Sequence, residues 1–304
     1  MPKTSTKQYG RVLSLALEHP WAITPTMLTT IATVMARHVA GGELAGEPGF
    51  VPREPAPAGS AGGGVYVIPI HGVIAPRMNL FSDISGGATF EEATQQLREA
   101  VAAPGVGTIV LDWDSPGGSA AGATEFAREL LKATTVKPVI SHANFQMCSG
   151  AYWTGACATE VIASPSAILG SIGVYTLHED LSKALADMGI TLTYVSAGKY
   201  KVDGNPAEPL SDTARARLTA LVNATYERFV ADVAEGRGVS AAAVKSGYGE
   251  GTVLNADEAL AAGLIDRIET FDDTVARLLR EPTPNSRRMA AQTEMETALH
   301  ALAW

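Results

Sequence analysis

Between residues 65 and 279, short runs rich in β-branched residues alternate with stretches whose apolar residues recur at helical spacing. The run at 108–113, Thr-Ile-Val-Leu-Asp-Trp, is almost continuously apolar, which is typical of a strand buried on both faces of a parallel sheet. Repeated strand–helix units of this kind predict an α/β fold with a parallel β-sheet core and flanking helices. The predicted strands are 65–74, 108–113, 136–143, 160–163, 168–174 and 192–196.

Capping residues mark several of the predicted helices. Thr89 and Glu92 form a Thr-x-x-Glu capping box ahead of an apolar stripe that includes Leu97. A further helix is predicted over 149–158, and the longest covers 211–235, where Gly236 is expected to end it.

The remaining segments differ in composition from this part of the chain. Residues 41–64 contain eight Gly and four Pro in 24 positions, and such a stretch cannot offset its ordering entropy, which predicts a linker. We therefore divide the chain into an N-terminal helical segment (1–40, with a helix over 25–38), the linker, a main domain (65–280) and a C-terminal tail (281–304).

The composition excludes several classes of protein. The formal net charge is −9, so the chain lacks the basic field that binds a phosphate backbone, and we do not expect a nucleic-acid partner. No apolar run approaches the ~18 residues that cross a bilayer, and we expect neither a signal peptide nor a membrane anchor. Two cysteines form no disulfide framework or four-ligand zinc pattern, so we expect a soluble protein of a reducing compartment, without metal or cofactor.

Three short motifs contain residues suited to catalysis. Asp114-Ser115-Pro116-Gly117-Gly118 follows a predicted strand, and its glycines allow backbone N–H groups to approach a ligand. The second motif, Cys148-Ser149-Gly150, lies at a strand-to-helix junction, where a serine is either an N-cap or an exposed nucleophile.

The third motif, Gly-Lys-Tyr-Lys-Val-Asp-Gly-Asn-Pro at 198–206, contains Lys199 and Lys201. Most lysines are solvated surface charges, but a desolvated neutral lysine can act as a general base. Taken singly, each of the three motifs is also compatible with an ordinary turn, cap or surface role.

Together the motifs resemble the signal peptide peptidase A (protease IV) family of serine–lysine peptidases, and in particular its branch of phage prohead or capsid-maturation proteases. The resemblance covers about 65–280 and depends on the order and spacing of its motifs. These are VYVIPIHGVI, DSPGGS, CSGAYW, SPSAILGSIGV, GKYKVDGNP and LNADEALAAGLID.

The resemblance implies a Clp protease/crotonase-like fold that assembles as a homo-oligomer. It places the nucleophile on Ser149, the catalytic lysine on Lys201, and a serine that orients this lysine on Ser171. The oxyanion hole would be formed by the backbone N–H groups of Gly118 and Gly150. Cys148, directly before the serine, is expected only to pack.

We therefore expect a serine endopeptidase with a Ser–Lys dyad that cleaves phage scaffold, capsid or portal proteins during head maturation. It would act in the host cytoplasm, within the prohead, and would also cleave itself within 41–64 or 281–304. Three alternatives stay open: a host-type cytoplasmic protease resembling signal peptide peptidases, a crotonase-like acyl-CoA enzyme, and an inactive capsid or scaffold component. For His178 and Asp180 an ordinary surface or capping role is favoured over a Ser-His-Asp site, so the lysine is preferred as the base.

Overall fold

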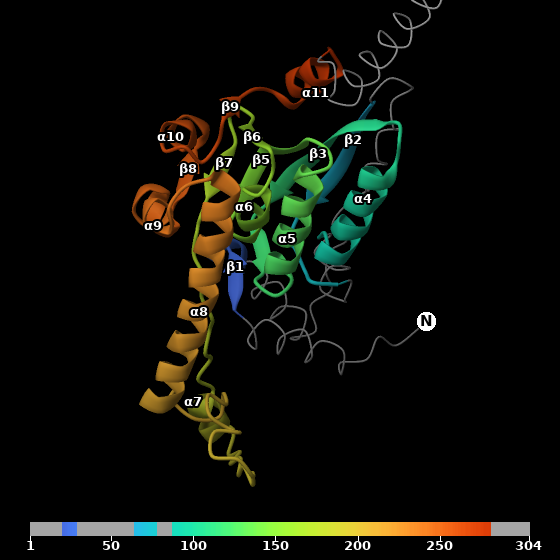
Figure 1. Ribbon diagram of the computed structural model, residues 1–304. Coiled ribbons are helices and arrows are strands. Elements are labelled where there is room, and N and C mark those ends of the chain that lie inside the picture. Colours follow the sequence, from blue (N-terminus) through green and yellow to red (C-terminus); the bar gives the residue numbers. More distant parts are fainter. Residues whose placement is uncertain (1–19, 29–63, 78–86, 281–304) are drawn as a thin grey trace, which may run out of the picture.

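The computed structural model describes residues 20–28, 64–77 and 87–280 (Figure 1). Apart from Gly64, the predicted linker lies outside these residues, as do the C-terminal tail and most of the N-terminal segment. Of the helix predicted over 25–38, only residues 25–28 are described, and they are helical.

A mostly parallel sheet forms the core, in the order β2-β3-β5-β6-β9, and β7 extends it by pairing with β5 and β8. Every neighbouring pair is parallel except β7 with β8. The predicted α/β class with a parallel sheet is confirmed. The strands are β2 (Gly64–His71), β3 (Val106–Ser115), β5 (Val139–Cys148), β6 (Glu160–Ala163), β7 (Ile168–Gly170), β8 (Val253–Asn255) and β9 (Arg267–Ile268).

The central strand β3 is buried on both faces, as its apolar sequence predicts. Alternate side chains of a strand point to opposite faces. Ile109 and Leu111 accordingly belong to the large core cluster with Leu97 of α4 (Phe90–Ala102) and Phe126 of α5 (Ala123–Thr134). Val110 belongs to a second cluster with residues of α11 (Phe271–Arg280).

Helix α8 (Asp212–Arg237) begins at the predicted position, where the Ser211 side chain accepts a hydrogen bond from the amide of Ala214. It ends two residues later than predicted, at Gly238, which has a φ of 65°. Gly236 lies inside the helix. A Cβ placed there would lie 2.5 Å from the Ala156 carbonyl oxygen, so this glycine permits close packing against α6 (Gly150–Gly155) and its C-cap.

The strand predicted at 192–196 does not form. This segment belongs to an arm, residues 176–211, that includes α7 (Ser182–Asp187) and projects from the body beside α8 (Figure 1). Val195 is 98% exposed. Because a strand needs a hydrogen-bonded neighbour, the β propensity of this segment is not sufficient on its own.

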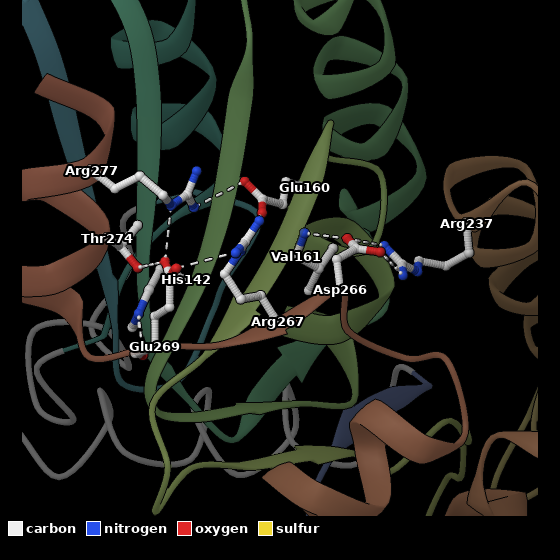
Figure 2. A network of polar contacts seen from close by, with 9 residues as sticks. All are labelled: His142, Glu160, Val161, Arg237, Asp266, Arg267, Glu269, Thr274 and Arg277. Atoms are coloured by element: carbon white, nitrogen blue, oxygen red, sulfur yellow. Dashed lines mark hydrogen bonds and ion pairs between the residues drawn. The ribbon is translucent and has the colours of Figure 1, made fainter. Parts of the chain in front are cut away.

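A network of ion pairs holds the end of the domain against the sheet (Figure 2). Arg277 of α11 binds Glu160 of β6 and Glu269, and Asp266 accepts bonds from Arg237 and from the amide of Val161. These contacts fasten β9 and α11 to the sheet edge, away from the end at which the predicted site residues lie.

Candidate active site

Ser149 lies between the end of β5 and the first residue of α6, in a conformation with φ 52° and ψ −116°. A positive φ in a non-glycine residue is strained and recurs at functional sites. The amide of Ser149 donates to the carbonyl of Gly170 at 2.7 Å, and its Oγ donates to the carbonyl of Gly173 at 3.4 Å. Ser149 occupies the N-cap position, yet its side chain makes no capping hydrogen bond. Helix capping therefore does not explain this serine.

The glycine motif after β3 lies directly beside Ser149. The strands β3 and β5 are parallel neighbours, so the motifs that follow them meet at one edge of the sheet. A Cβ placed on Gly150 would lie 3.3 Å from the Gly118 nitrogen, and one on Gly117 would lie 2.9 Å from the Gly150 nitrogen. The structure thus brings together the two residues predicted to supply the oxyanion hole.

Gly117–Ser119 form a short strand, β4, that the sequence analysis missed. One edge of β4 contacts Ile74 so closely that a Cβ on Gly118 would lie 1.9 Å from the Ile74 carbonyl oxygen. The other edge pairs antiparallel with β1 (Trp21–Ile23), which the sequence analysis also missed. The available signal was the short apolar run Trp21-Ala22-Ile23 between Pro20 and Pro25.

Ser171 follows Gly170, the residue whose carbonyl accepts from Ser149. It is buried, has a φ of 53°, and donates its amide to the Thr252 carbonyl at 2.7 Å. Ser171 is therefore two positions from the Gly173 carbonyl that accepts the Ser149 hydroxyl.

Lys201 is not brought to Ser149 within the chain. It lies in the exposed loop of the arm between α7 and α8, as does Lys199, whose ammonium lies 4.9 Å from the centre of the Tyr200 ring. No hydrogen bond joins Lys201 to Ser149 in the part of the chain that the structure describes.

The other candidate groups do not take part in this arrangement. Cys148 is fully buried and its Sγ lies 3.7 Å from the Ile168 carbonyl oxygen, as expected of a packing residue. Asp180 accepts a bond from the Ser182 amide, and neither it nor His178 is bonded to Ser149 among the described residues. In those ranges, no group of three or more His, Cys, Asp or Glu side chains could hold a metal ion, and no helix is long and apolar enough to span a membrane.

Comparison with solved structures finds distant similarities. The alignment with a ClpP1 mutant from Listeria monocytogenes covers 69% of this chain and 94% of that protein, with a TM-score of 0.44 and 14% identity. The alignment with a mutant of the 1510-N membrane-bound stomatin-specific protease covers 72% of this chain and 85% of that protein, also with a TM-score of 0.44 and 14% identity.

Sequence comparison finds nearer relatives. The chain is 30% identical to capsid assembly protease C of Escherichia phage lambda over 77% of its own length and 54% of that protein. It is also 30% identical to the head-tail preconnector protein GP5 of Enterobacteria phage P21 (70% of this chain, 42% of that protein) and to protease 4 of Salmonella typhi (71% and 34%). The chain thus spans about half the length of the first of these relatives and less of the others.

The family description that matches the sequence is peptidase family S49, over residues 132–282. This range contains Ser149, Ser171 and Lys201 and begins just before β5. It includes the motifs from CSGAYW onward on which the predicted resemblance depends. Through this match and its protease relatives, the chain belongs to peptidase family S49.

Proposed function

We propose that the chain is a serine endopeptidase in which the Ser149 Oγ attacks the carbonyl carbon of a substrate peptide bond. The observation that carries this proposal is the strained, uncapped Ser149 beside the closely spaced backbone nitrogens of Gly118 and Gly150. Two backbone N–H groups aimed at one point stabilise the oxyanion of a tetrahedral intermediate. Collapse of that intermediate releases the amine product and leaves an acyl group on Ser149, which water then removes.

The general base in this proposal is Lys201, contributed by a neighbouring subunit. A base must lie within hydrogen-bond reach of the proton it takes, and the exposed arm holds Lys201 elsewhere. The arm also exposes apolar side chains that a second copy would cover, namely Leu177, Met188, Ile190, Leu192, Tyr194 and Val195. Contact with a second subunit would remove water from Lys201, which favours the neutral form that accepts a proton.

The substrates we propose are phage head proteins, in the context of the prohead. This follows from the names of two relatives, a capsid assembly protease and a head-tail preconnector protein. The host-type alternative is supported by the similarity to protease 4 of Salmonella typhi. Self-cleavage within 41–64 or 281–304 is part of the proposal, and these ranges lie outside the described residues apart from Gly64.

Hydrolysis of an unfolded protein substrate by the purified full chain tests the proposal. Ser149→Ala should reduce the rate at least about 10³-fold with little change in the melting temperature, because this serine makes no capping bond and its hydrogen bond to the Gly173 carbonyl is long. Lys201→Ala and Lys201→Arg should be equally damaging, since arginine stays protonated. Lys199→Ala is the matched control and should remain active.

Mixing the two inactive variants tests the contribution of the second subunit. Ser149→Ala and Lys201→Ala, combined before assembly, should recover a fraction of the wild-type rate, because some sites then hold one intact serine and one intact lysine. A mixture without activity would exclude the shared site. Full activity in Ser149→Ala alone would show that Ser149 is not the nucleophile. A lack of hydrolysis by the wild type would instead favour the acyl-CoA or inactive-component alternatives.

A further inference from the structure

The strand β1 lies in a slot beside the proposed oxyanion hole. One edge of β1 pairs with β4, in the register Trp21–Ser119, Ala22–Gly118 and Ile23–Gly117. Its other edge pairs with Tyr175, where Trp21 donates its amide at 2.8 Å and accepts one at 3.1 Å. We call this place, between β4 and Tyr175, the strand slot. An extended segment within it has hydrogen-bond partners on both sides.

The register of β1 against β4 places the carbonyl of Ala22 at the proposed oxyanion hole. The amide of Ala120 donates to the Pro20 carbonyl, and the amide of Thr24 donates to the Pro116 carbonyl. Along an antiparallel ladder, hydrogen-bonded pairs alternate with pairs that are not hydrogen-bonded. Ala22 and Gly118 lie midway between the two bonded pairs just named, and they therefore form the next hydrogen-bonded pair. The Ala22 carbonyl oxygen accordingly lies 3.0 Å from a Cβ placed on Gly150 and 2.2 Å from one placed on Gly117.

The occupied slot is closed to other peptides. Trp21, Ala22 and Ile23 are buried, and Ser149 beneath them is 1% exposed. A substrate that offered its carbonyl to Gly118 and Gly150 would need the backbone partners that β1 now uses. Occupation by β1 and binding of a substrate therefore exclude each other.

We propose that Trp21–Ile23 is a resident, substrate-like strand that keeps the active site closed until a substrate displaces it. The proposal rests on the proposed function for the role of Ser149. In this arrangement Ala22 holds the position of the residue whose carbonyl is attacked, while Trp21 and Ile23 mark the positions before and after it.

The resident strand also indicates what kind of peptide the slot accepts. Ala22 is fully buried with Gly150 beside it, so a larger side chain at this position would meet neighbouring atoms. The bulky side chains of Trp21 and Ile23 are nevertheless almost fully buried. The slot therefore suits an extended segment with a small residue at the attacked carbonyl and large apolar residues on both sides.

The test uses a substitution that should release β1 from the strand slot in the whole chain. Binding of a peptide to the slot is measured separately from peptide hydrolysis. Ala22→Arg places a long charged side chain where no space exists, which should release β1. Ala242→Arg, on the exposed face of α9 (Ala241–Gly247), is the matched control. The probe is a fluorescent peptide with the sequence of residues 18–27, and its binding is measured by anisotropy in a Ser149→Ala background.

We expect the probe to bind at least tenfold more tightly to Ser149→Ala/Ala22→Arg than to Ser149→Ala, and kcat/KM of Ala22→Arg to rise at least tenfold. Ala242→Arg should change neither. Should Ala22→Arg fail to fold, Thr24→Pro provides the second variant, because proline lacks the amide that donates to Pro116 and so weakens the pairing of β1 with β4.

Unchanged binding and hydrolysis in a folded variant would overturn the proposal while leaving the proposed function intact. Tighter binding without hydrolysis by any form would instead support the resident strand and remove the proposed function. A new amino terminus at Ile23 in the wild type, absent from Ser149→Ala, would also overturn the proposal, because the segment would then be a substrate.

Discussion

The indole Nε1 of Trp153 donates a hydrogen bond to the carboxylate of Asp232 at 2.9 Å, which fastens the helix beginning after Ser149 to α8. The Trp153 ring also stacks on Phe229 of the same helix, with centroids 4.5 Å apart. Asp232 is 1% exposed and binds the Arg128 guanidinium with its other oxygen. The turn that holds Ser149 is therefore supported by a fully buried polar contact.

Removing this contact should destabilise the protein. Asp232→Ala leaves the buried Trp153 N–H without an acceptor, which typically costs about 1–3 kcal/mol. Glu235→Ala is the matched control, because Glu235 binds the same arginine in the exposed part of the interface and should cost less than about 1 kcal/mol. Urea denaturation of the two variants measures the difference. Equal losses would show that the Trp153 contact contributes nothing specific.

Much of the core could be predicted from the sequence, because it depends on local patterns, and the residues of the candidate site could be proposed from the motifs of the family resemblance. The apolar run at 108–113 is enough to predict a buried central strand, and it lies within β3. The juxtaposition of the motifs at Gly118 and Ser149 was implied by the family resemblance, and it arises because β3 and β5 are parallel neighbours whose ends lie at the same sheet edge. The strand itself needs only periodicity, whereas the juxtaposition needs the order of the strands in the sheet.

Other features depend on contacts between segments that are distant in the sequence. The strand β1 has three residues, and it forms only because β4 and Tyr175 pair with both of its edges. Gly236 looks like a helix stop, although its role is to let α8 approach Ala156. The segment 192–196 has strand propensity, but no strand among the described residues pairs with it. Neither composition nor periodicity contains this information.

Ser171 provides a prediction about catalysis. We expect it to position Lys201, because a hydroxyl can bind a lysine without favouring the charged form as a carboxylate would. Ser171→Ala should therefore lower kcat by about 10²–10⁴-fold, the range typical of acid–base contributions, and should change the pH profile of kcat. The melting temperature should change little. Ser166→Ala, at an exposed position before β7, is the control. A wild-type kcat and pH profile in Ser171→Ala would leave this serine a structural role.

Cys148 provides a test of which side chain is the nucleophile. Burial raises the pKa of its thiol to about 12. At pH 8 only about one thiol in 10⁴ is then ionised, and the thiolate is the reactive form. Iodoacetamide should not inhibit peptide cleavage, and Cys148→Ala should retain wild-type kcat, while a fluorophosphonate should inactivate both proteins. Loss of cleavage in Cys148→Ala, together with full cleavage by Ser149→Ala, would contradict the assignment of Ser149.

The burial of His142 should make the stability of the protein depend on pH. It is fully buried on β5, its ring contacts Phe271 of α11 edge-on, and its Nε2 lies 3.2 Å from the Glu269 carbonyl oxygen. Burial lowers the pKa of this imidazole below its ordinary 6.5, and this effect outweighs the opposing influence of Asp112 and Glu269. The folded protein therefore keeps His142 neutral at a pH at which the unfolded chain already binds a proton.

The sign of the effect follows from linkage. Where the unfolded state binds more protons, the free energy of unfolding falls as the pH falls. His142 should therefore reduce stability progressively from about pH 6.5 down to its lowered pKa, by at most about 1.4 kcal/mol per pH unit. His142→Gln removes the titrating group, so its urea-unfolding free energy should depend less on pH between 6.5 and 5 than that of the wild type. Parallel curves for the two proteins would show that His142 does not contribute to acid destabilisation.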